Sequence, residues 1–180
     1  YPRSLDYDFI SHLVNLSAPL RNFALMVRLM AGYELMTEGF SKHQSGSSAM
    51  PHKMNVRTAE RVYGLANLMR MYAMGASLLS GDQWEEGDVS CSVPRRLILS
   101  DSCYAMDAMF ESGLTVMNDM GFYPHMIDAE VQRFLPFLGS SRLLMASVEE
   151  GLDREDAHKV IKKAMVNSAR RLREGEVISP

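Results

Sequence analysis

The sequence FISHLVNLSAPLRNFALMVRLM, residues 9–30, decides the fold class. Its large apolar residues recur with alternating spacings of four and three, at Phe9, Leu13, Leu16, Leu20, Phe23, Val27 and Met30. This heptad spacing is typical of a long helix that packs one apolar face against other helices, and it predicts a helix over about residues 5–31. Pro19 lies off that face, and we expect it to kink the helix. The alternative is a split into two helices, with Ser17 as the N-cap of the second.

Two further stretches repeat this rhythm with smaller residues. Their apolar faces are formed by Ala59, Val62, Ala66, Met69, Ala73 and Ala76, and by Ile98, Ser102, Ala105, Met109, Ser112 and Val116. Small residues on such faces let helices approach closely. The last of the three helices is expected to begin at Pro94, which suits a first helical turn, and to end near Met117. Three long helices of this kind predict an all-α fold built on a helix bundle.

The chain from residue 121 onward has a different organisation. The run GFYPH interrupts the long helices there, and shorter ones are expected at about residues 127–135, 141–150 and 153–175. Pro136 should end the first of these, and Asp153 should be the N-cap of the last. We therefore expect two domains, 1–120 and 121–180, and we see no strand signal. The basic residues of the last helix suggest either an anion site or, as we favour, a solvated face.

The composition is that of an ordinary globular protein. Of 180 residues, 47% are hydrophobic and 23% are charged, and the formal net charge is -3. A weakly acidic chain has no general electrostatic reason to bind nucleic acid or an anionic membrane surface. No apolar run approaches the ~18 residues that span a bilayer. Cys91 and Cys103 are expected to be reduced thiols of a cytoplasmic protein, with a disulfide between them as the alternative. The chain does not begin with Met, and we expect it to be a piece of a longer protein.

Residues 41–61, SKHQSGSSAMPHKMNVRTAER, form a polar segment between the first two long helices. Such a segment cannot pack as part of a core, and loops held by rigid elements commonly carry function. Its centre, GSSAMPHKMN at residues 46–55, combines serine hydroxyls with a lysine six residues after the first serine. A serine can act as a base only where donors or a cation stabilise its alkoxide and water is excluded. The alternative is an ordinary Ser/Gly connector.

A second polar stretch, QWEEGDVSCSVPRR at residues 83–96, leads into the third helix. Ser92 should lie near the start of that helix, where backbone N–H groups and the helix dipole favour an anion such as phosphate. Arg95 and Arg96 fall in the first turn, where acidic residues are usual. We expect an anion site here; the alternative is that the arginines pair with the acidic residues of 85–88.

GSSAMPHKMN closely resembles the signature loop of the fumarase/aspartase superfamily, in the form found in the branch that acts on succinylated purine nucleotides. The resemblance extends to the ER pair at 60–61, to the QW and S..RR pattern of 83–96 and to the C-terminal helices, and so to essentially the whole chain. It implies an all-α fold, a long-helix bundle followed by a small helical C-terminal domain. Residues 1–120 would be the C-terminal part of the central bundle domain. The N-terminal domain of the family, with its general-acid histidine, would be absent.

The resemblance also implies an activity and a set of site residues. The reaction would be an anti β-elimination of fumarate from a succinylated purine nucleotide, catalysed by a carbon–nitrogen lyase of purine biosynthesis. Ser47 is similar to the family's general base, and Lys53 to the residue that stabilises the charge of the carbanion. The residues that resemble substrate ligands are Ser48, Met50, Asn55, Arg61, Ser92 and Arg96. No metal or cofactor is implied, and a homotetramer with active sites shared between subunits is expected.

Two positions depart from the family pattern. Val56 follows the signature where many members have proline, and Gly87 stands where some members place a substrate-binding arginine. One alternative function is that of another superfamily member, such as a carboxymuconate cycloisomerase or an argininosuccinate lyase. The ER pair and the S..RR pattern favour the nucleotide substrate. The other alternative is an inactive helical fragment, and we expect no turnover from the 180-residue chain alone.

Overall fold

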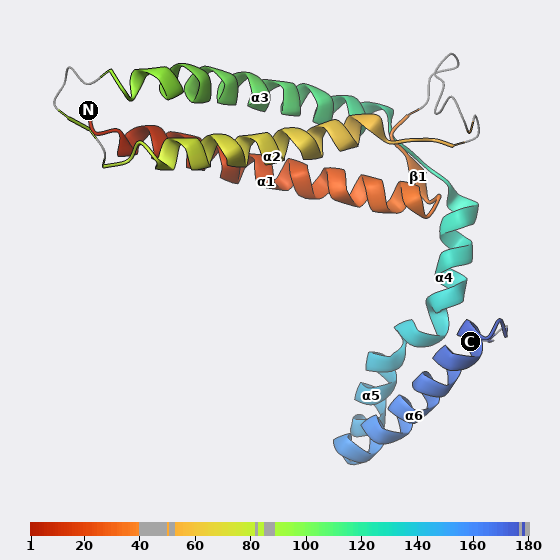
Figure 1. Ribbon diagram of the computed structural model, residues 1–180. Coiled ribbons are helices and arrows are strands. Elements are labelled where there is room, and N and C mark those ends of the chain that lie inside the picture. The colour runs from red at the N-terminus through yellow and green to blue at the C-terminus, as the bar shows by residue number, and fades with distance from the viewer. Residues whose placement is uncertain (40–49, 51–52, 82, 85–88, 177, 179–180) are drawn as a thin grey trace. The chain divides into compact units, whose positions relative to one another are not determined.

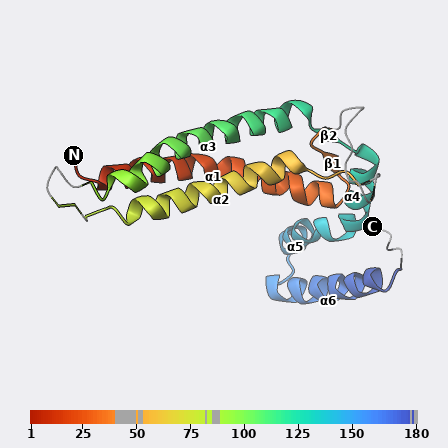
Figure 2. The same ribbon diagram turned by 45° about the horizontal axis from the view of Figure 1, so that its top comes forward.

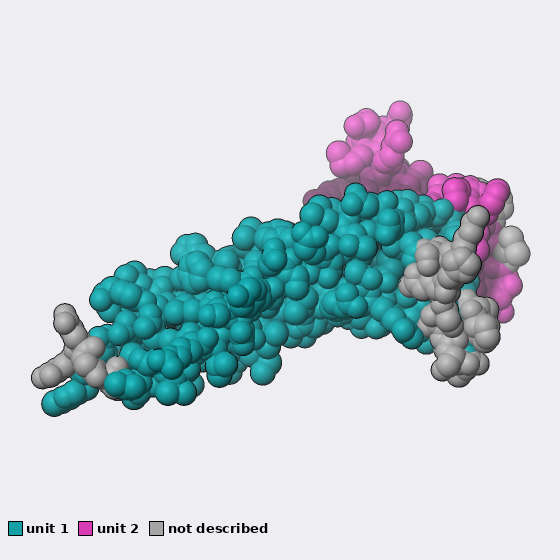
Figure 3. Space-filling view, turned by 90° about the horizontal axis from the view of Figure 1, so that it is seen from above, with its two compact units in different colours: residues 1–123 teal, residues 124–180 magenta. Residues whose placement is uncertain are grey.

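The structure is a computed structural model, and it describes residues 1–39, 50, 53–81, 83–84, 89–176 and 178. These residues form two compact units, Tyr1–Tyr123 and Pro124–Pro180 (Figure 3). The first unit consists of α1 (Ser4–Gly32), β1 (Met36–Thr37), α2 (Arg57–Ser77), α3 (Ser92–Asp119) and β2 (Gly121–Phe122). The second consists of α4 (Pro124–Leu138), α5 (Ser140–Glu149) and α6 (Arg154–Arg173). The predicted all-α fold is confirmed, because the two strands have only two residues each.

Helix α1 runs through Pro19 as one helix, so the alternative of two separate helices is wrong. The Ser17 hydroxyl does not cap a second helix. It donates a hydrogen bond to the carbonyl of Val14 (2.7 Å), which lies one turn earlier in the same helix. A hydroxyl that bonds back to the preceding turn is satisfied inside a helix and needs no helix end.

The buried face of α1 is rotated from the predicted one. Phe9 and Leu16 were expected in the core but are 45% and 51% exposed, whereas Ser17 and Ala24 are 2% and 1% exposed. The buried line of α1 thus includes small residues, together with Ile10 and Val27 at 0% and 1% exposure. Of the predicted face, Val27 is confirmed in the core, and four residues pack against the core from its edge: Leu13, Leu20, Phe23 and Met30.

The predicted apolar faces of α2 and α3 are confirmed. In α2 the buried residues are Ala59, Val62, Ala66, Met69 and Ala76, with Ala73 half-buried. In α3 all six predicted residues are buried. Helix α3 begins at Ser92 rather than at Pro94, and the proline lies in its first turn.

The three long helices form a bundle in which α2 lies against both α1 and α3 (Figures 1 and 2). A single position shows how closely the helices approach. A Cβ atom at Gly113 of α3 would lie 3.0 Å from a methyl group of Leu20 on α1, tighter than ordinary packing allows. The missing Cβ atom at Gly113 therefore favours the close approach of α3 to α1, since the Leu20 methyl group would have to move to admit one.

The strands β1 and β2 join the two ends of chain that leave α1 and α3. They pair antiparallel, with Met36 opposite Phe122 and Thr37 opposite Gly121. The sequence contains no recognisable strand signal at these positions, and the expectation of no strand is wrong. Strands of two residues are too short to show the alternation of polar and apolar residues by which strands are predicted.

The second unit follows the prediction in two of its three helices. Helix α5 lies within one residue of the predicted range, and α6 begins after Asp153, whose carboxylate accepts hydrogen bonds from the N–H groups of Glu155 (2.9 Å) and Asp156 (3.3 Å). Helix α4 was expected to end near Pro136 but includes it and continues to Leu138. Among the residues that the structure describes, no helix is long and apolar enough to cross a membrane.

Candidate active site

The polar segment rejoins the bundle through residues 53–56, which lead into α2. Lys53 and Met54 are exposed, Asn55 is half-buried and Val56 is buried at 8% exposure. The backbone N–H of Lys53 donates to the carbonyl of Met50 (3.0 Å). Burial of Val56 anchors the exit of the polar segment while leaving the lysine side chain in solvent.

The start of α2 is capped from a distant part of the sequence. Its own N-cap residue, Val56, offers no side-chain hydrogen bond. Instead the two carboxylate oxygens of Glu38 accept hydrogen bonds from the backbone N–H groups of Thr58 and Ala59, each at 2.9 Å. These N–H groups have no partner inside the helix, and a carboxylate is favoured there by the helix dipole as well. Glu38 is only 6% exposed.

Glu38 is itself held by the small sheet and by the end of α3. It follows β1 directly, and the next residue, Gly39, has a φ of 101°. A Cβ atom at Gly39 would lie 2.6 Å from Cβ of Asp119, so only glycine fits this conformation and this contact. The N–H of Tyr123, just after β2, donates to the carbonyl of Leu35, just before β1 (3.0 Å), and this hydrogen bond extends the pairing of the two strands.

The predicted site residues at this end of the bundle are only partly described. Ser47 and Ser48 lie outside the described residues, and Met50 is 45% exposed. Lys53 and Arg61 are exposed, and Arg57 adds a third exposed cation near the start of α2. Within the part of the chain that the structure describes, none of these three cations forms an ion pair. Unpaired cations beside a helix N-terminus suit an anionic ligand.

Ser92 and Arg96 lie at the start of α3, where α2 ends. Ser92 is half-buried in the first turn, and Arg96 is exposed in the same turn. Trp84, before this helix, is 79% exposed. The stretch with Gly87 lies outside the described residues.

Arg95 is used differently from Arg96. Its Nε donates to Oδ2 of Asp6 at the start of α1 (2.5 Å), and its guanidinium also contacts the Tyr1 hydroxyl. Tyr1 in turn donates to Oδ1 of Asp6 (2.8 Å). Arg95 is therefore paired with an acid of α1. The acidic residues of 85–88, the alternative partners, lie outside the described residues.

The contacts of Asp6 shift its protonation. Burial raises the pKa of Asp6, but the hydrogen bonds from Arg95 and Tyr1 and the charges of Arg95 and Arg3 outweigh burial. The net effect is a pKa below the ordinary value of 3.8. Asp6 thus stays ionised at neutral pH, and Arg95 is not available to a substrate.

The two groups of predicted site residues lie far apart along one chain. A Cβ atom at Gly75 of α2 would lie 3.4 Å from Ile98 of α3, which places Arg96 beside the last part of α2. Arg61 lies fourteen residues before Gly75 on the same helix. At 1.5 Å per residue this corresponds to about 21 Å along the helix axis. The start of α2 and the start of α3 lie at opposite ends of the bundle (Figure 1). Lys53 and Arg61 therefore lie near one end, and Ser92 and Arg96 near the other.

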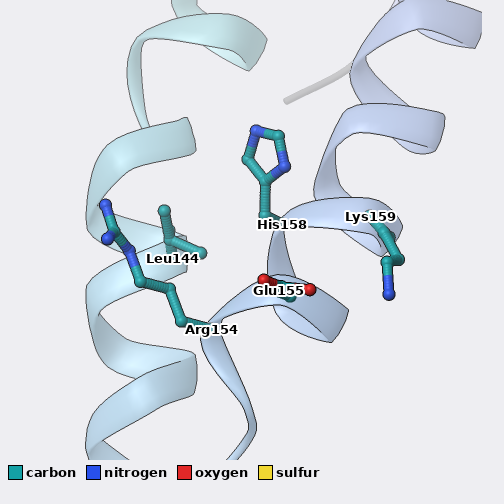
Figure 4. Close-up of a pocket in the computed structure, with 5 residues that line it drawn as sticks. All are labelled: Leu144, Arg154, Glu155, His158 and Lys159. Carbon is teal, nitrogen blue, oxygen red and sulfur yellow. The ribbon is translucent and has the colours of Figure 1, made fainter.

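A separate hollow of about 390 Å³ lies between α5 and α6 in the second unit (Figure 4). Its lining residues are Leu144, Arg154, Glu155, His158 and Lys159. The four polar ones are exposed, and Lys159 forms an ion pair with Asp156 (3.0 Å) on its own helix. Exposure of the basic residues Arg154 and Lys159 agrees with the favoured interpretation that this helix carries a solvated basic face.

Two residues of this site could not be found from the sequence. Glu38 lies twenty residues before the N–H groups that it caps, and Asp6 lies 89 residues before Arg95. No local pattern connects such pairs. Cys91 and Cys103 do not form a disulfide with each other, so the disulfide alternative is wrong. No group of His, Cys, Asp and Glu that could hold a metal ion occurs among the residues described.

In a comparison with known proteins, the relatives reported below share one name. The chain is 33% identical over 156 residues to adenylosuccinate lyase from Synechocystis sp., which covers 86% of this chain and 36% of that protein. It is 32% identical over 170 residues to adenylosuccinate lyase from Methanothermobacter thermautotrophicus, covering 91% of this chain and 37% of that protein. The chain thus spans about a third of the length of these curated relatives. No protein-family model matches it.

Among solved structures, the chain is similar to 3-carboxy-cis,cis-muconate lactonizing enzyme from Pseudomonas putida. The TM-score is 0.74, and the similarity covers 94% of this chain and 37% of that enzyme. The sequence identity is 17%, so the similarity establishes the fold and carries no information on the substrate.

Proposed function

Because this chain belongs by sequence to the adenylosuccinate lyases, we propose that it forms the C-terminal part of such an enzyme. The intact enzyme would eliminate fumarate from adenylosuccinate to give AMP, and from succinylaminoimidazole carboxamide ribotide in the same pathway of purine nucleotide synthesis. The observation that carries the proposal is the identity of about a third of the residues over nine tenths of the chain. The likeness to the lactonizing enzyme does not favour the alternative, because it is a likeness of fold.

In this proposal the reaction needs a base, a cation and an acid. Ser47 removes a proton from Cβ of the succinyl group, the electrons of that C–H bond form the double bond of fumarate, and the C–N bond breaks. The departing nitrogen takes a proton from an acid outside this chain. Lys53 and Asn55 stabilise the negative charge that develops on the adjacent carboxylate. One such donor commonly contributes ~3 kcal/mol to the transition state.

The remaining site residues bind the substrate in this proposal. Ser48 and Met50 contact it from the signature loop, and Arg61, Ser92 and Arg96 hold its carboxylate and phosphate groups. The exposed cations Lys53 and Arg61, near the start of α2, support the assignment of an anionic substrate. The reaction as written needs no metal or cofactor.

The distance between the two groups of site residues supports an oligomer. Arg61 and Arg96 of one chain are separated by about 21 Å along the bundle, so they do not converge on one reacting atom. A second copy that places its α3 start beside the α2 start of the first would bring them together. This arrangement agrees with the proposal of a homotetramer with shared active sites. We also propose that the enzyme works in the cytoplasm. The two compact units, Tyr1–Tyr123 and Pro124–Pro180, support the proposal that residues 1–120 are part of a bundle domain and 121–180 a C-terminal domain.

The decisive experiment is Ser47→Ala in the intact protein, with loss of adenylosuccinate followed in a turnover assay. Removing a general base should lower kcat by about 10²- to 10⁴-fold. Ser41→Ala, a serine of the same segment outside the signature, is the matched control and should retain normal kcat. A Ser47→Ala enzyme with unchanged kcat removes the base assignment, and an intact wild-type protein without turnover removes the proposed function.

A further inference from the structure

Glu38 lies where three elements of the first unit meet. It follows β1, its carboxylate holds the first turn of α2, and the residue after it contacts the end of α3. Glu38 is not among the residues expected to contact substrate. We propose that Glu38 is a positioning residue for the elimination reaction: it fixes the start of α2 and thereby the location of Lys53 and Asn55. The inference rests on the proposed function.

The geometry around Glu38 leaves little freedom. Each carboxylate oxygen accepts one backbone N–H, from Thr58 and from Ala59, at 2.9 Å. Two hydrogen bonds to one planar group fix its orientation as well as its distance. A buried carboxylate is costly unless it is hydrogen-bonded, so at 6% exposure Glu38 strongly favours the state in which both bonds are made.

The small sheet and the residues next to it hold Glu38 in place. The pairing of β1 with β2 ties it to the C-terminal end of α3. Position 39 accepts only glycine next to Asp119, because a Cβ atom there would lie 2.8 Å from the Asp119 carbonyl oxygen. A second link crosses the same region, since the Tyr123 hydroxyl contacts the sulfur of Met54 (3.2 Å). The residues on either side of Met54 are Lys53 and Asn55, so the links converge on the proposed charge-stabilising groups.

This arrangement predicts a specific kinetic effect. Lys53 and Asn55 lie five and three residues before Thr58, without a regular element of their own. A loosened first turn of α2 would therefore displace them, while Ser92 and Arg96 at the other end of the bundle would stay in place. Misplacement of a charge-stabilising group by about 1 Å can cost 10²-fold in rate. We expect kcat to fall with little change in KM.

The experiment compares Glu38→Gln, Glu38→Ala and the control Glu111→Gln in the intact protein. Glu111 is an exposed glutamate on α3. Glu38→Gln keeps one acceptor oxygen and should lower kcat about 3- to 10-fold, whereas Glu38→Ala keeps none and should lower it about 10- to 100-fold. KM should change less than about three-fold in both, and Glu111→Gln should match wild type. All kcat values are measured well below each variant's Tm.

A second measurement reads the contact itself. Hydrogen exchange of the Thr58 and Ala59 amides should accelerate more than ten-fold in Glu38→Ala and remain at the wild-type rate in Glu111→Gln. Fast exchange together with wild-type kcat in folded Glu38→Ala would show a purely structural cap and overturn the inference. Should Glu38→Ala not fold, a normal kcat in Glu38→Gln has the same consequence. A wild-type protein that is folded but inactive instead overturns the proposed function and the catalytic role of Glu38 with it.

Discussion

Asp6 joins the beginning of α1 to the beginning of α3 through single side chains. It is 4% exposed and receives hydrogen bonds from Arg95 and Tyr1. A charge in this position is stable only because its partners replace water. Asp6 therefore helps to position the first turn of α3, in which the proposed substrate ligands Ser92 and Arg96 lie.

Asp6→Asn should destabilise the first unit, because it leaves the Arg95 guanidinium without a carboxylate. We expect the free energy of unfolding to fall by about 2 kcal/mol, less than for a fully buried pair because Arg95 is partly solvated. Denaturant unfolding measures the change. Asp8→Asn, an exposed residue on the same helix, is the matched control and should stay within about 0.5 kcal/mol of wild type. Equal stability of both variants would contradict this role for Asp6.

The same contact predicts a dependence of stability on pH. Because the pKa of Asp6 is lower in the folded than in the unfolded chain, its contribution is complete above the unfolded pKa. It is lost as the pH falls through the lower, folded pKa. The difference in unfolding free energy between wild type and Asp6→Asn should be constant from neutral pH to about pH 5 and shrink below about pH 4. A difference that grows on acidification contradicts the direction of the shift.

Single residues mark the limit of what the sequence could predict. Arg95 and Arg96 were recognised as unusual cations in a first helical turn, but their separate uses depend on Asp6, which is distant in sequence. Glu38 was missed for the same reason. Contacts across dozens of residues become predictable only after the helices have been placed against one another.

The helices show which part of the fold is encoded locally. The faces of α2 and α3 were predicted because their buried positions follow the helical repeat with few competing apolar residues. In α1, large apolar residues occur on more than one face, and the sequence alone favoured bulk over close approach. Pro136 was expected to end α4, yet one proline close to a helix end removes only one hydrogen bond.

The join between β1, α2 and α3 can be tested with two glycines. Gly39→Ala forces a Cβ atom to within 2.6 Å of Asp119 and a side chain into a positive φ. We expect a loss of about 2 kcal/mol or more in unfolding free energy. Gly64→Ala adds a methyl group to an exposed site of α2 with nothing within 4 Å, and should stabilise by about 0.5 to 1 kcal/mol. Thermal unfolding of the two variants measures both changes. A Gly39→Ala variant as stable as wild type would contradict the close contact with Asp119.

At the scale of the whole molecule, the two groups of candidate site residues lie at opposite ends of one bundle, and our proposal requires a second copy to bring them together. The exposed apolar residues of α1, such as Phe9 and Leu16, are the kind of surface that another chain or domain covers. The sequence pattern could not distinguish these residues from buried ones, because a heptad face has the same spacing whether it packs against the same chain or against another.

Mixing two inactive variants tests shared sites directly. Lys53→Ala and Arg96→Ala should each abolish turnover in the intact protein. If a site takes Lys53 from one copy and Arg96 from another, co-expression of the two variants should restore about a quarter of the wild-type activity, because some sites then receive neither substitution. A mixture as inactive as the separate variants would place both residues of a site on one chain.

Trp84 gives this protein an internal optical reporter. It is the only tryptophan of the chain, and 79% of its surface meets solvent near the start of α3. Any change in indole fluorescence from this chain can thus be attributed to one known position without introducing a label. A bound nucleotide or a neighbouring chain that covers the ring would move the emission maximum toward the blue, so the association could be followed in real time on the unmodified polypeptide.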